Sequence, residues 1–441
     1  MMKRYCVNIS DEAAAVWFAH QAKTGLKRDP ALEALLLEFG GLKPPEPVEP
    51  EYPTDYDVEV SQKGDLILVR SGLNTLLSTV KSDAANAFQV AVNAVPSGGS
   101  LGIGEGTYEL PALYPVALDA DGGNIFYCCI PILDRSMHIH GAGVGKTIIK
   151  LAAWQRATNR HVAMMLIRGT GPIKAGYSAF TLEGITFDGN SKFQYAGTPH
   201  DGESLVLVGS GRKNGKFENL EFRNSHGAGL YLGNNGEGNG GYNELVRGCV
   251  ARSCAGAGIM LDTNHDSRVE DCQAYGCREG LYLNGNDDWK DRGPDRVTVT
   301  GFRADSQVMV WQVNDFKISS LEMDCSKAKA SYGLVVRDGS GQVVDSKLKS
   351  DKKKASAYGS ATFIYRGAVV TFDACDISGY WGIRAIEKAK VRATNCDISA
   401  SGACFAMVDD NAPMEATIIA EACKCTGKKL ELQDGATFEE I

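Results

Sequence analysis

Polar side chains that could bind or cleave a ligand follow three similar apolar segments of the chain. "GLYL" at 229–232 is followed by "GNNGEGN", "GIML" at 258–261 by "DTNHD", and "GLYL" at 280–283 by "NGNDDWKDRGPD". If the three apolar segments are equivalent strands, the residues after them lie side by side along one edge of a sheet. The candidates are Asn234, Asn235, Glu237, Asp262, His265, Asp266, Asn286, Asp287, Asp288, Trp289 and Lys290.

The carboxylates of this cluster suggest work on a polysaccharide. On adjacent coils they would lie about 5 Å apart, and two coils apart about 10 Å, which brackets the separations in retaining and inverting glycosidases. The candidate catalytic residues are Asp262, Asp266, Asp287 and Asp288.

The remaining polar and aromatic residues of the cluster could hold a glycan. Trp289 could stack on a sugar ring, and Lys290 or Arg292 could neutralise a uronate carboxylate. The candidate glycan-binding residues are Asn234, Asn235, His265, Asn286, Trp289 and Lys290.

Turn formation alone could also account for this composition, because Asn, Asp and Gly tolerate positive φ and bond to nearby backbone. Three interpretations stay open: turns, a non-catalytic sugar site, and catalysis. "GTPHDGES" at 197–204 could bring His200 and Asp201 to the same edge. The Asp-Pro-His motif of alginate-modifying β-helices fits poorly there, since Thr198 stands where its Asp should be.

Pairs of cysteines recur at a fixed interval. Cys249 and Cys272 are 23 residues apart, as are Cys254 and Cys277. Thirteen cysteines cannot all pair within one chain, and neither C-x₂-C pairs nor nearby histidines mark a zinc site. We therefore expect small, buried core residues, with Leu220 and either Val299 or Thr300 in the related place of the flanking coils, and we predict no metal and no cofactor.

The elements that would position these residues form a repeat. "FENLEFRNSHGAGLYL", "VRGCVARSCAGAGIML" and "VEDCQAYGCREGLYL" share a strand, a polar turn, a glycine and a second strand, at intervals of about 21–29 residues. Strands fill each unit, so the pattern predicts an all-β, parallel β-helix.

The entry "DAANAFQVAVNAVPSGGSLGIGEGTYEL" at 83–110, with "MHIHGAGVGKTIIKL" and "FTLEGITFDGN", resembles the right-handed parallel β-helix, or pectin-lyase-like, superfamily. The resemblance implies a single-stranded right-handed β-helix over 96–430, after lead-in strands and a capping helix at 57–95 and before a tail at 431–441. "GAGVGKT" at 141–147 is one residue short of a P-loop and should join two strands.

The first 56 residues differ in character. Residues 1–42 read as strand, helix, turn and helix and resemble a ribbon-helix-helix module, whose ribbon residues Lys3, Arg4, Tyr5 and Asn8 could contact DNA. The alternative is a small dimerising or docking module. Residues 43–56 form a proline-rich linker, so a small α/β module precedes the β-helix.

The net charge and the lack of recognisable targeting signals limit the expected binding partners and location. A net charge of −8 argues against a broad nucleic-acid surface, so nucleic acid is expected only through residues 1–40. The sequence shows no signal core and no membrane segment, so we expect no membrane partner and a location in a virion or the cytoplasm. The basic run "KLKSDKKKAS" at 347–356 reads as a solvated loop, with contact to an anionic polymer as the alternative.

The superfamily contains polysaccharide lyases, hydrolases and epimerases as well as phage tailspikes and fibres, so the fold leaves the function open. The combination of lead-in strands, entry helix and "GTYEL" coil is most similar to viral and prophage β-helix proteins. It implies a structural or receptor-binding protein of a virus-like particle that contacts glycans or other particle proteins. The alternatives are a polysaccharide-active enzyme and a DNA-binding regulator.

We also expect a homo-oligomer, because several large apolar residues fall at positions that could point outward. They are Val308, Met309, Val310, Trp311, Tyr365, Tyr380 and Trp381.

Overall fold

The computed structural model describes residues 56–72, 74–117, 125–133, 135–156, 161–168, 179–194, 203–209, 213–233, 241–285, 296–327, 332–351, 359–407 and 415–441. The ribbon-helix-helix prediction, with Lys3, Arg4, Tyr5 and Asn8, lies outside these residues. So do the predictions for Asn234, Asn235, Glu237, Asn286, Asp287, Asp288, Trp289, Lys290 and Arg292, and for His200 and Asp201. In the described part no helix is long and apolar enough to cross a membrane.

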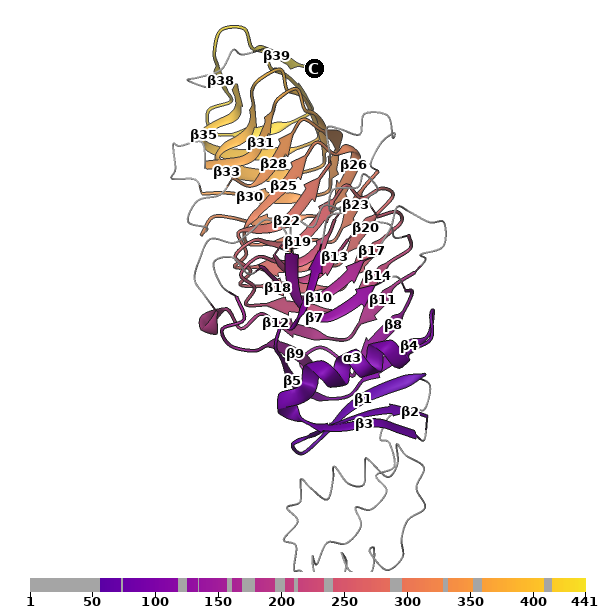
Figure 1. The fold of residues 1–441 in the computed structure, drawn as a ribbon. Coiled ribbons are helices and arrows are strands. Elements are labelled where there is room, and N and C mark those ends of the chain that lie inside the picture. Colours follow the sequence, from indigo (N-terminus) through magenta and orange to yellow (C-terminus); the bar gives the residue numbers. More distant parts are fainter. Residues whose placement is uncertain are drawn as a thin grey trace, which may run out of the picture.

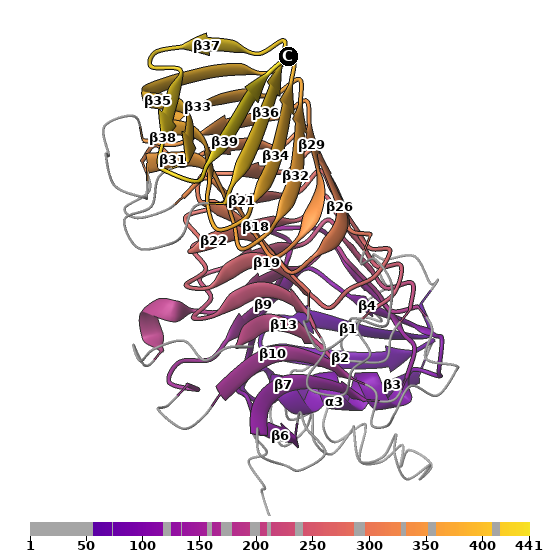
Figure 2. The ribbon, with the colours of Figure 1, turned by 90° about the horizontal axis from the view of Figure 1, so that it is seen from above.

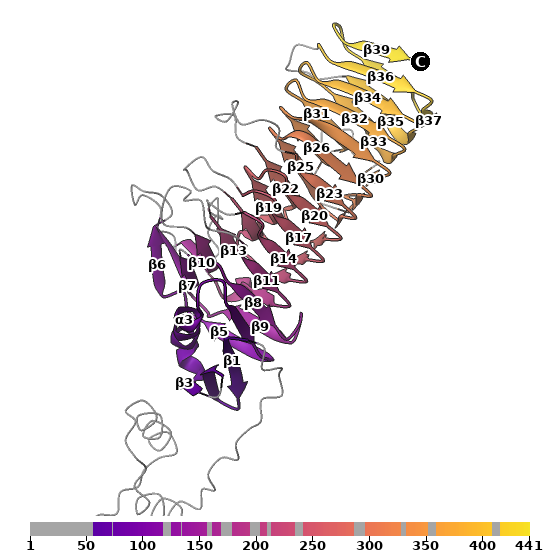
Figure 3. The same cartoon turned by 90° about the vertical axis from the view of Figure 1, so that its right-hand side faces the viewer.

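The described chain is a parallel β-helix, as predicted, whose coils stack along one axis (Figures 1 and 3). Each regular coil contributes one strand to each of three rows, which we call rows A, B and C in chain order. Each strand pairs in parallel with the equivalent strand of the coil before and after it.

Row A belongs to a 16-stranded sheet. Its parallel strands are β4 (Ser100–Ile103), β8 (His138–Gly141), β11 (Thr181–Glu183), β14 (Lys216–Glu218), β17 (Leu245–Arg247), β20 (Arg268–Glu270), β23 (Thr298–Thr300), β26 (Asn314–Ser319), β29 (Ser340–Val344), β32 (Val369–Asp373), β34 (Lys390–Thr394), β36 (Thr417–Glu421) and β39 (Thr437–Glu440).

Rows B and C belong to a 23-stranded sheet. Row B holds β5 (Gly106–Leu110), β9 (Thr147–Leu151), β12 (Thr186–Asp188), β15 (Glu221–Arg223), β18 (Val250–Arg252), β21 (Gln273–Tyr275), β24 (Arg303–Ala304), β27 (Glu322–Asp324), β30 (Lys347–Lys349) and β37 (Lys424–Thr426). Row C holds β7 (Ile125–Leu133), β10 (His161–Arg168), β13 (Ser204–Val208), β16 (Ala228–Leu232), β19 (Ala257–Asp262), β22 (Glu279–Asn284), β25 (Gln307–Trp311), β28 (Leu334–Arg337), β31 (Ser360–Tyr365) and β38 (Leu430–Leu432). The long strands β33 (Asp376–Ala385) and β35 (Asp397–Met407) run through both rows.

The first coil is covered by the lead-in segment. Strand β1 (Val58–Lys63) pairs in parallel with β4, and β2 (Leu66–Ser71) and β3 (Asn74–Val80) extend this sheet with antiparallel pairing. After the 3₁₀ turn η1 (Lys81–Asp83), helix α3 (Ala84–Ala94) lies across the end of the coils and buries Phe88 against Tyr108 (Figure 1). Strand β6 (Tyr114–Ala117) pairs antiparallel with β7, and η2 (Ser191–Phe193) is a single 3₁₀ turn.

A single left-handed residue makes the corner between rows A and B. This corner residue has φ near +50° to +70° at Gly184, Asn219, Gly248, Asp271, Gly301, Ser320, Asp345, Ala374, Asn395 and Ala422. Glycine, asparagine and aspartate accept this conformation most easily, which explains why they dominate the list. Consecutive corners are 35 residues apart at Gly184 and Asn219 but 19 at Gly301 and Ser320, so the loops elsewhere absorb the differences in coil length.

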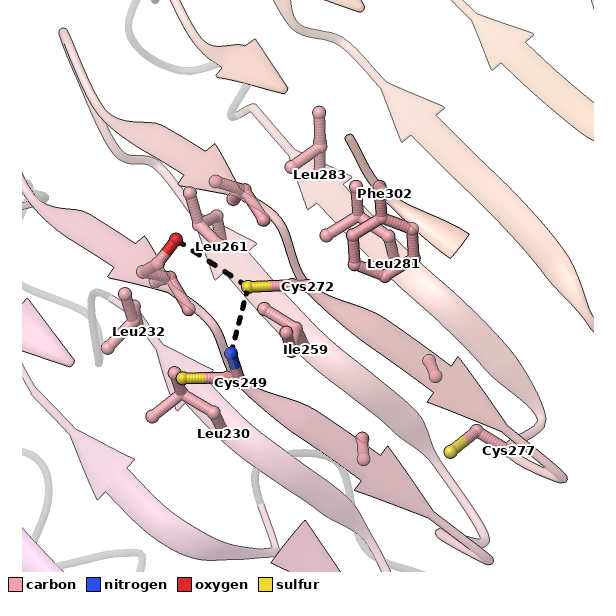
Figure 4. Packing of buried hydrophobic residues seen from close by; sticks show 14 of the residues in the cluster. Leu230, Leu232, Cys249, Ile259, Leu261, Cys272, Cys277, Leu281, Leu283 and Phe302 are labelled. Carbon is pink, nitrogen blue, oxygen red and sulfur yellow. Dashed lines mark hydrogen bonds between the residues drawn. The ribbon is translucent and has the colours of Figure 1, made fainter. Parts of the chain in front are cut away.

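The residue after each corner points into the core, and these residues stack through the coils. In the middle of the stack Leu220, Cys249, Cys272 and Phe302 are each 0% exposed. The Cys249 amide donates to the Cys272 sulfur at 3.4 Å (Figure 4). The prediction that the cysteines are core residues is confirmed, and the cysteines of the described residues are free thiols. The prediction of Val299 or Thr300 for the flanking coil is wrong, because the corner at Gly301 sets the phase and Phe302 follows it.

Candidate functional site

Row C presents its outward side chains in two straight lines that cross the coils. Strand register places Asp262 beside Asn284, Asn284 beside Trp311, Trp311 beside Arg337, and Arg337 beside Tyr365. We call these five residues the polar row. Each is partly exposed, whereas the residue before each one in its strand is buried in the core. The row spans four strand spacings, about 19 Å.

A more apolar line runs beside the polar row. Its members are Tyr231, Met260, Tyr282, Met309, Val335, Phe363 and Arg384, again in strand register. Met260, Tyr282 and Met309 are half-buried, so the outer surface of β19, β22 and β25 combines apolar area with the polar row. The prediction that Val308 and Val310 could point outward is wrong: both are buried, because they alternate with Met309 and Trp311.

Asp262 is the carboxylate at the start of the polar row. Its Oδ2 accepts a hydrogen bond from the Tyr231 hydroxyl at 2.6 Å, and its Oδ1 accepts one from the Asn284 side-chain amide at 2.8 Å. Burial raises the pKa of Asp262 above its ordinary value, although the hydrogen bonds from Tyr231 and Asn284 act in the opposite direction. A carboxylate with a raised pKa, held by hydrogen bonds from a phenol and an amide, is suited to transferring a proton.

His265 and Asp266 do not join Asp262 in one site. His265 is buried and stacks on Tyr242, with ring centroids 4.9 Å apart. Asp266 forms an ion pair with Arg296, and that hydrogen bond lowers the pKa of Asp266. The three candidates that fall among the described residues therefore have three separate sets of partners, and Asp262 alone of them lies on the row C surface.

Sequence reasoning missed Tyr231, Asn284 and the aromatic end of the polar row as parts of one surface. The Arg337 guanidinium lies over the Trp311 ring at 4.0 Å and within 5.9 Å of the Tyr365 centroid. The signal was present in the tyrosine of "GLYL", which alternation places on the outer face. Only the strand register between neighbouring coils shows that Tyr231 lies next to Asp262.

No described group of three or more His, Cys, Asp or Glu side chains is arranged to hold a metal ion. "GAGVGKT" lies between β8 and β9 as predicted, where a P-loop would need a following helix.

Comparison with known proteins agrees with this architecture. Residues 173–299 match the family model described as the right-handed beta helix region. No curated protein sequence matches the chain significantly.

Three solved structures illustrate the structural similarity. The A-module of the mannuronan C-5 epimerase AlgE4 from Azotobacter vinelandii has 16% identity and a TM-score of 0.58, over 80% of this chain and 94% of that one. The Agl-KA catalytic domain has 14% identity and a TM-score of 0.53, over 81% of this chain and 65% of that one. The catalytic domain of a GH87 alpha-1,3-glucanase in complex with tetrasaccharides has 13% identity and a TM-score of 0.48, over 91% and 70%.

At such low identity the first two matches establish the fold and leave the activity open. With the matched repeat region and the three rows of parallel strands, they show that the described coils form a right-handed parallel β-helix.

Proposed function

We propose that this protein binds a polysaccharide along the outer surface of row C and acts on it through Asp262. The hydrogen-bonded pair of Asp262 and Tyr231 at the start of the polar row carries this proposal. The mannuronan epimerase that shares the fold provides a precedent for a polysaccharide substrate.

The polar row suits an extended ligand. Its residues repeat at the strand spacing, so successive units of a linear polymer could meet Asp262, Asn284, Trp311, Arg337 and Tyr365 in turn. Trp311 and Tyr365 add aromatic surface, and the Arg337 guanidinium, which lies over the Trp311 ring, adds a cation. A sugar presents an apolar C–H face and polar hydroxyls, and this surface supplies partners for both.

Asp262 would supply the proton transfer. Lysis, hydrolysis and epimerisation of a polysaccharide all need a group that gives or takes a proton at the sugar, and positioned acid–base groups contribute about 10²–10⁴-fold to rates. Tyr231 holds the carboxylate in place, and its hydrogen bond offsets part of the increase that burial causes in the pKa of Asp262.

The test is a comparison of two carboxylate variants. The wild-type protein would be incubated with mannuronan, polygalacturonate and α-1,3-glucan, and assayed for new reducing ends, unsaturated products and exchange of sugar C–H for deuterium. We expect Asp262→Asn to reduce turnover at least about 100-fold while polymer binding is retained. Asp266→Asn is the matched control, because it removes the same charge from an exposed ion pair away from the row C surface.

Turnover that survives Asp262→Asn would contradict the catalytic role of Asp262. Binding without turnover of any polymer would instead favour a non-catalytic glycan contact. The role in a virus-like particle, self-association, and regulation of DNA through residues 1–40 stay predictions.

A further inference from the structure

Two aromatic side chains stand exposed on neighbouring coils, at the opposite end of the row C strands from Asp262. Trp154 lies in the turn between β9 and β10 and is 72% exposed. Phe193 lies in η2, between β12 and β13, and is 46% exposed. The Trp154 amide donates to the Phe193 carbonyl at 2.9 Å, which places the two turns side by side. The turn η2 stands out from the side of the coils (Figure 2).

The turn that carries Trp154 is held in place on both sides. The Gln194 side chain is buried; its oxygen accepts from the amides of Gln155 and Arg156, and its nitrogen donates to the Ala152 carbonyl at 2.7 Å. The buried Arg156 guanidinium pairs with Glu203, with 2.8 Å between Nη2 and Oε2. Trp154 is therefore an exposed residue in a turn whose neighbouring residues are anchored.

The backbone at Trp154 is also strained. Its φ is +58°, a conformation that is rare for a bulky side chain and that glycine or asparagine would adopt at lower cost. Neither packing nor a preferred backbone conformation explains a tryptophan at this position. Strain and exposure that persist together indicate a functional constraint on the ring.

We propose that Trp154 and Phe193 form a second carbohydrate contact, a stacking platform for sugar rings of the same polymer. The inference rests on the proposed function for the class of ligand. The two rings belong to adjacent coils, so they are offset by about one strand spacing. The exposed Lys192 has its ammonium 5.6 Å from the Phe193 centroid and adds a donor at the edge.

A protein partner suits the patch less well. Each aromatic ring can bury about 150–250 Å². Two rings together fall short of the roughly 800 Å² per partner in a stable protein interface. Two exposed rings beside a polar donor match the size of single sugar units.

Affinity electrophoresis through gels that contain mannuronan, polygalacturonate or soluble α-1,3-glucan oligomers tests the platform. We expect Trp154→Ala and Phe193→Ala each to weaken retardation at least about fivefold, and Trp154→Phe to keep part of the affinity. Val144→Ala is the matched control, because Val144 is also 46% exposed and lies in a turn between rows A and B. Turnover of a short oligosaccharide by Val144→Ala should equal that of the wild type.

Unchanged retardation of Trp154→Ala and Phe193→Ala in a protein that binds the polymer would overturn the platform and leave the role of Asp262 standing. Loss of retardation in these variants, combined with turnover that Asp262→Asn does not affect, would support the platform and refute Asp262. A wild-type protein that is retarded by none of the polymers would refute both. Light scattering completes the test: if Trp154→Ala dissociates an oligomer, the rings contact a second copy and the sugar assignment is wrong.

Discussion

Tyr231 and Asp262 are 31 positions apart in the chain, yet the Tyr231 hydroxyl donates to the Asp262 carboxylate at 2.6 Å. The contact exists because β16 and β19 are neighbours in row C, with Tyr231 beside Met260. Two residues from different coils thus act as one unit, and its protonation can be tested.

Replacing Tyr231 should shift the pH dependence of turnover. The hydrogen bond from Tyr231 lowers the pKa of Asp262, so Tyr231→Phe should raise that pKa further. The limb of the rate profile that reports Asp262 should therefore move to higher pH, whether Asp262 acts as acid or as base. Rate profiles of wild type and Tyr231→Phe check this. A limb that stays in place would show that another group titrates.

Substitution of Asp262 and of Asp266 should change the pH dependence of folding stability in opposite directions. The pKa of Asp262 is raised by burial, so its ionisation opposes folding; this cost is absent below the ordinary value of 3.8 and develops as the pH rises through the raised value. The free energy of unfolding of Asp262→Asn, compared with that of the wild type, should therefore be higher at pH 8 than at pH 4. Urea unfolding of the variant and wild type at both pH values measures the difference.

Asp266 provides the contrast. Its pKa is lowered by Arg296, so its ionisation favours folding above the ordinary range, and that contribution is lost as the pH falls. Asp266→Asn should cost a little stability at pH 8, and this cost should disappear only as the pH falls below the ordinary value of 3.8; the effect is small because the pair is exposed. Equal pH responses of the two variants would contradict the assignment of their environments.

The corner between rows A and B offers a stability test away from the site. Ala374 is exposed and has a φ of +52°, which costs an ordinary L-residue about 1–2 kcal/mol. Ala374→Asn should raise the free energy of unfolding by about 0.5–1 kcal/mol, since asparagine already serves at the corners Asn219 and Asn395. Ala255→Asn, an exposed position that lacks positive φ, should show no gain in denaturant unfolding.

The buried thiols should resist alkylation in the folded protein. Burial raises the pKa of Cys128 to about 12, and it raises the pKa of Cys249 with a further contribution from Cys272. Iodoacetamide followed by mass spectrometry should modify the half-exposed Cys423 before Cys128, Cys249 and Cys272. Denaturant should remove the difference. Early modification of Cys249 in folded protein would show that the core stack opens.

The coil period and the buried cysteines could be predicted because each coil repeats the same alternation of inward and outward residues. The residue that continues the cysteine stack in the next coil could not be predicted, because Val299 and Phe302 are both apolar. The left-handed Gly301 between them determines that Phe302 takes this position. The site was predictable only as far as Asp262. The hydrogen-bond partners of Asp262 depend on the strand register between coils of unequal length. The nearby His265 packs on Tyr242 instead of joining Asp262.

The coil-to-coil pairing also has a mechanical consequence. Each level of the β-helix, meaning one coil with its strands in rows A, B and C, is hydrogen-bonded to the level before and the level after it. Tension along the axis is therefore transmitted from level to level in series. Within one level the strands of rows A, B and C share that load. At β24 the row B strand has shrunk to two residues, Arg303 and Ala304, with correspondingly few hydrogen bonds to β21 and β27. At this level of the rod, the strands of rows A and C therefore carry a larger share of the tension than the row B strand does.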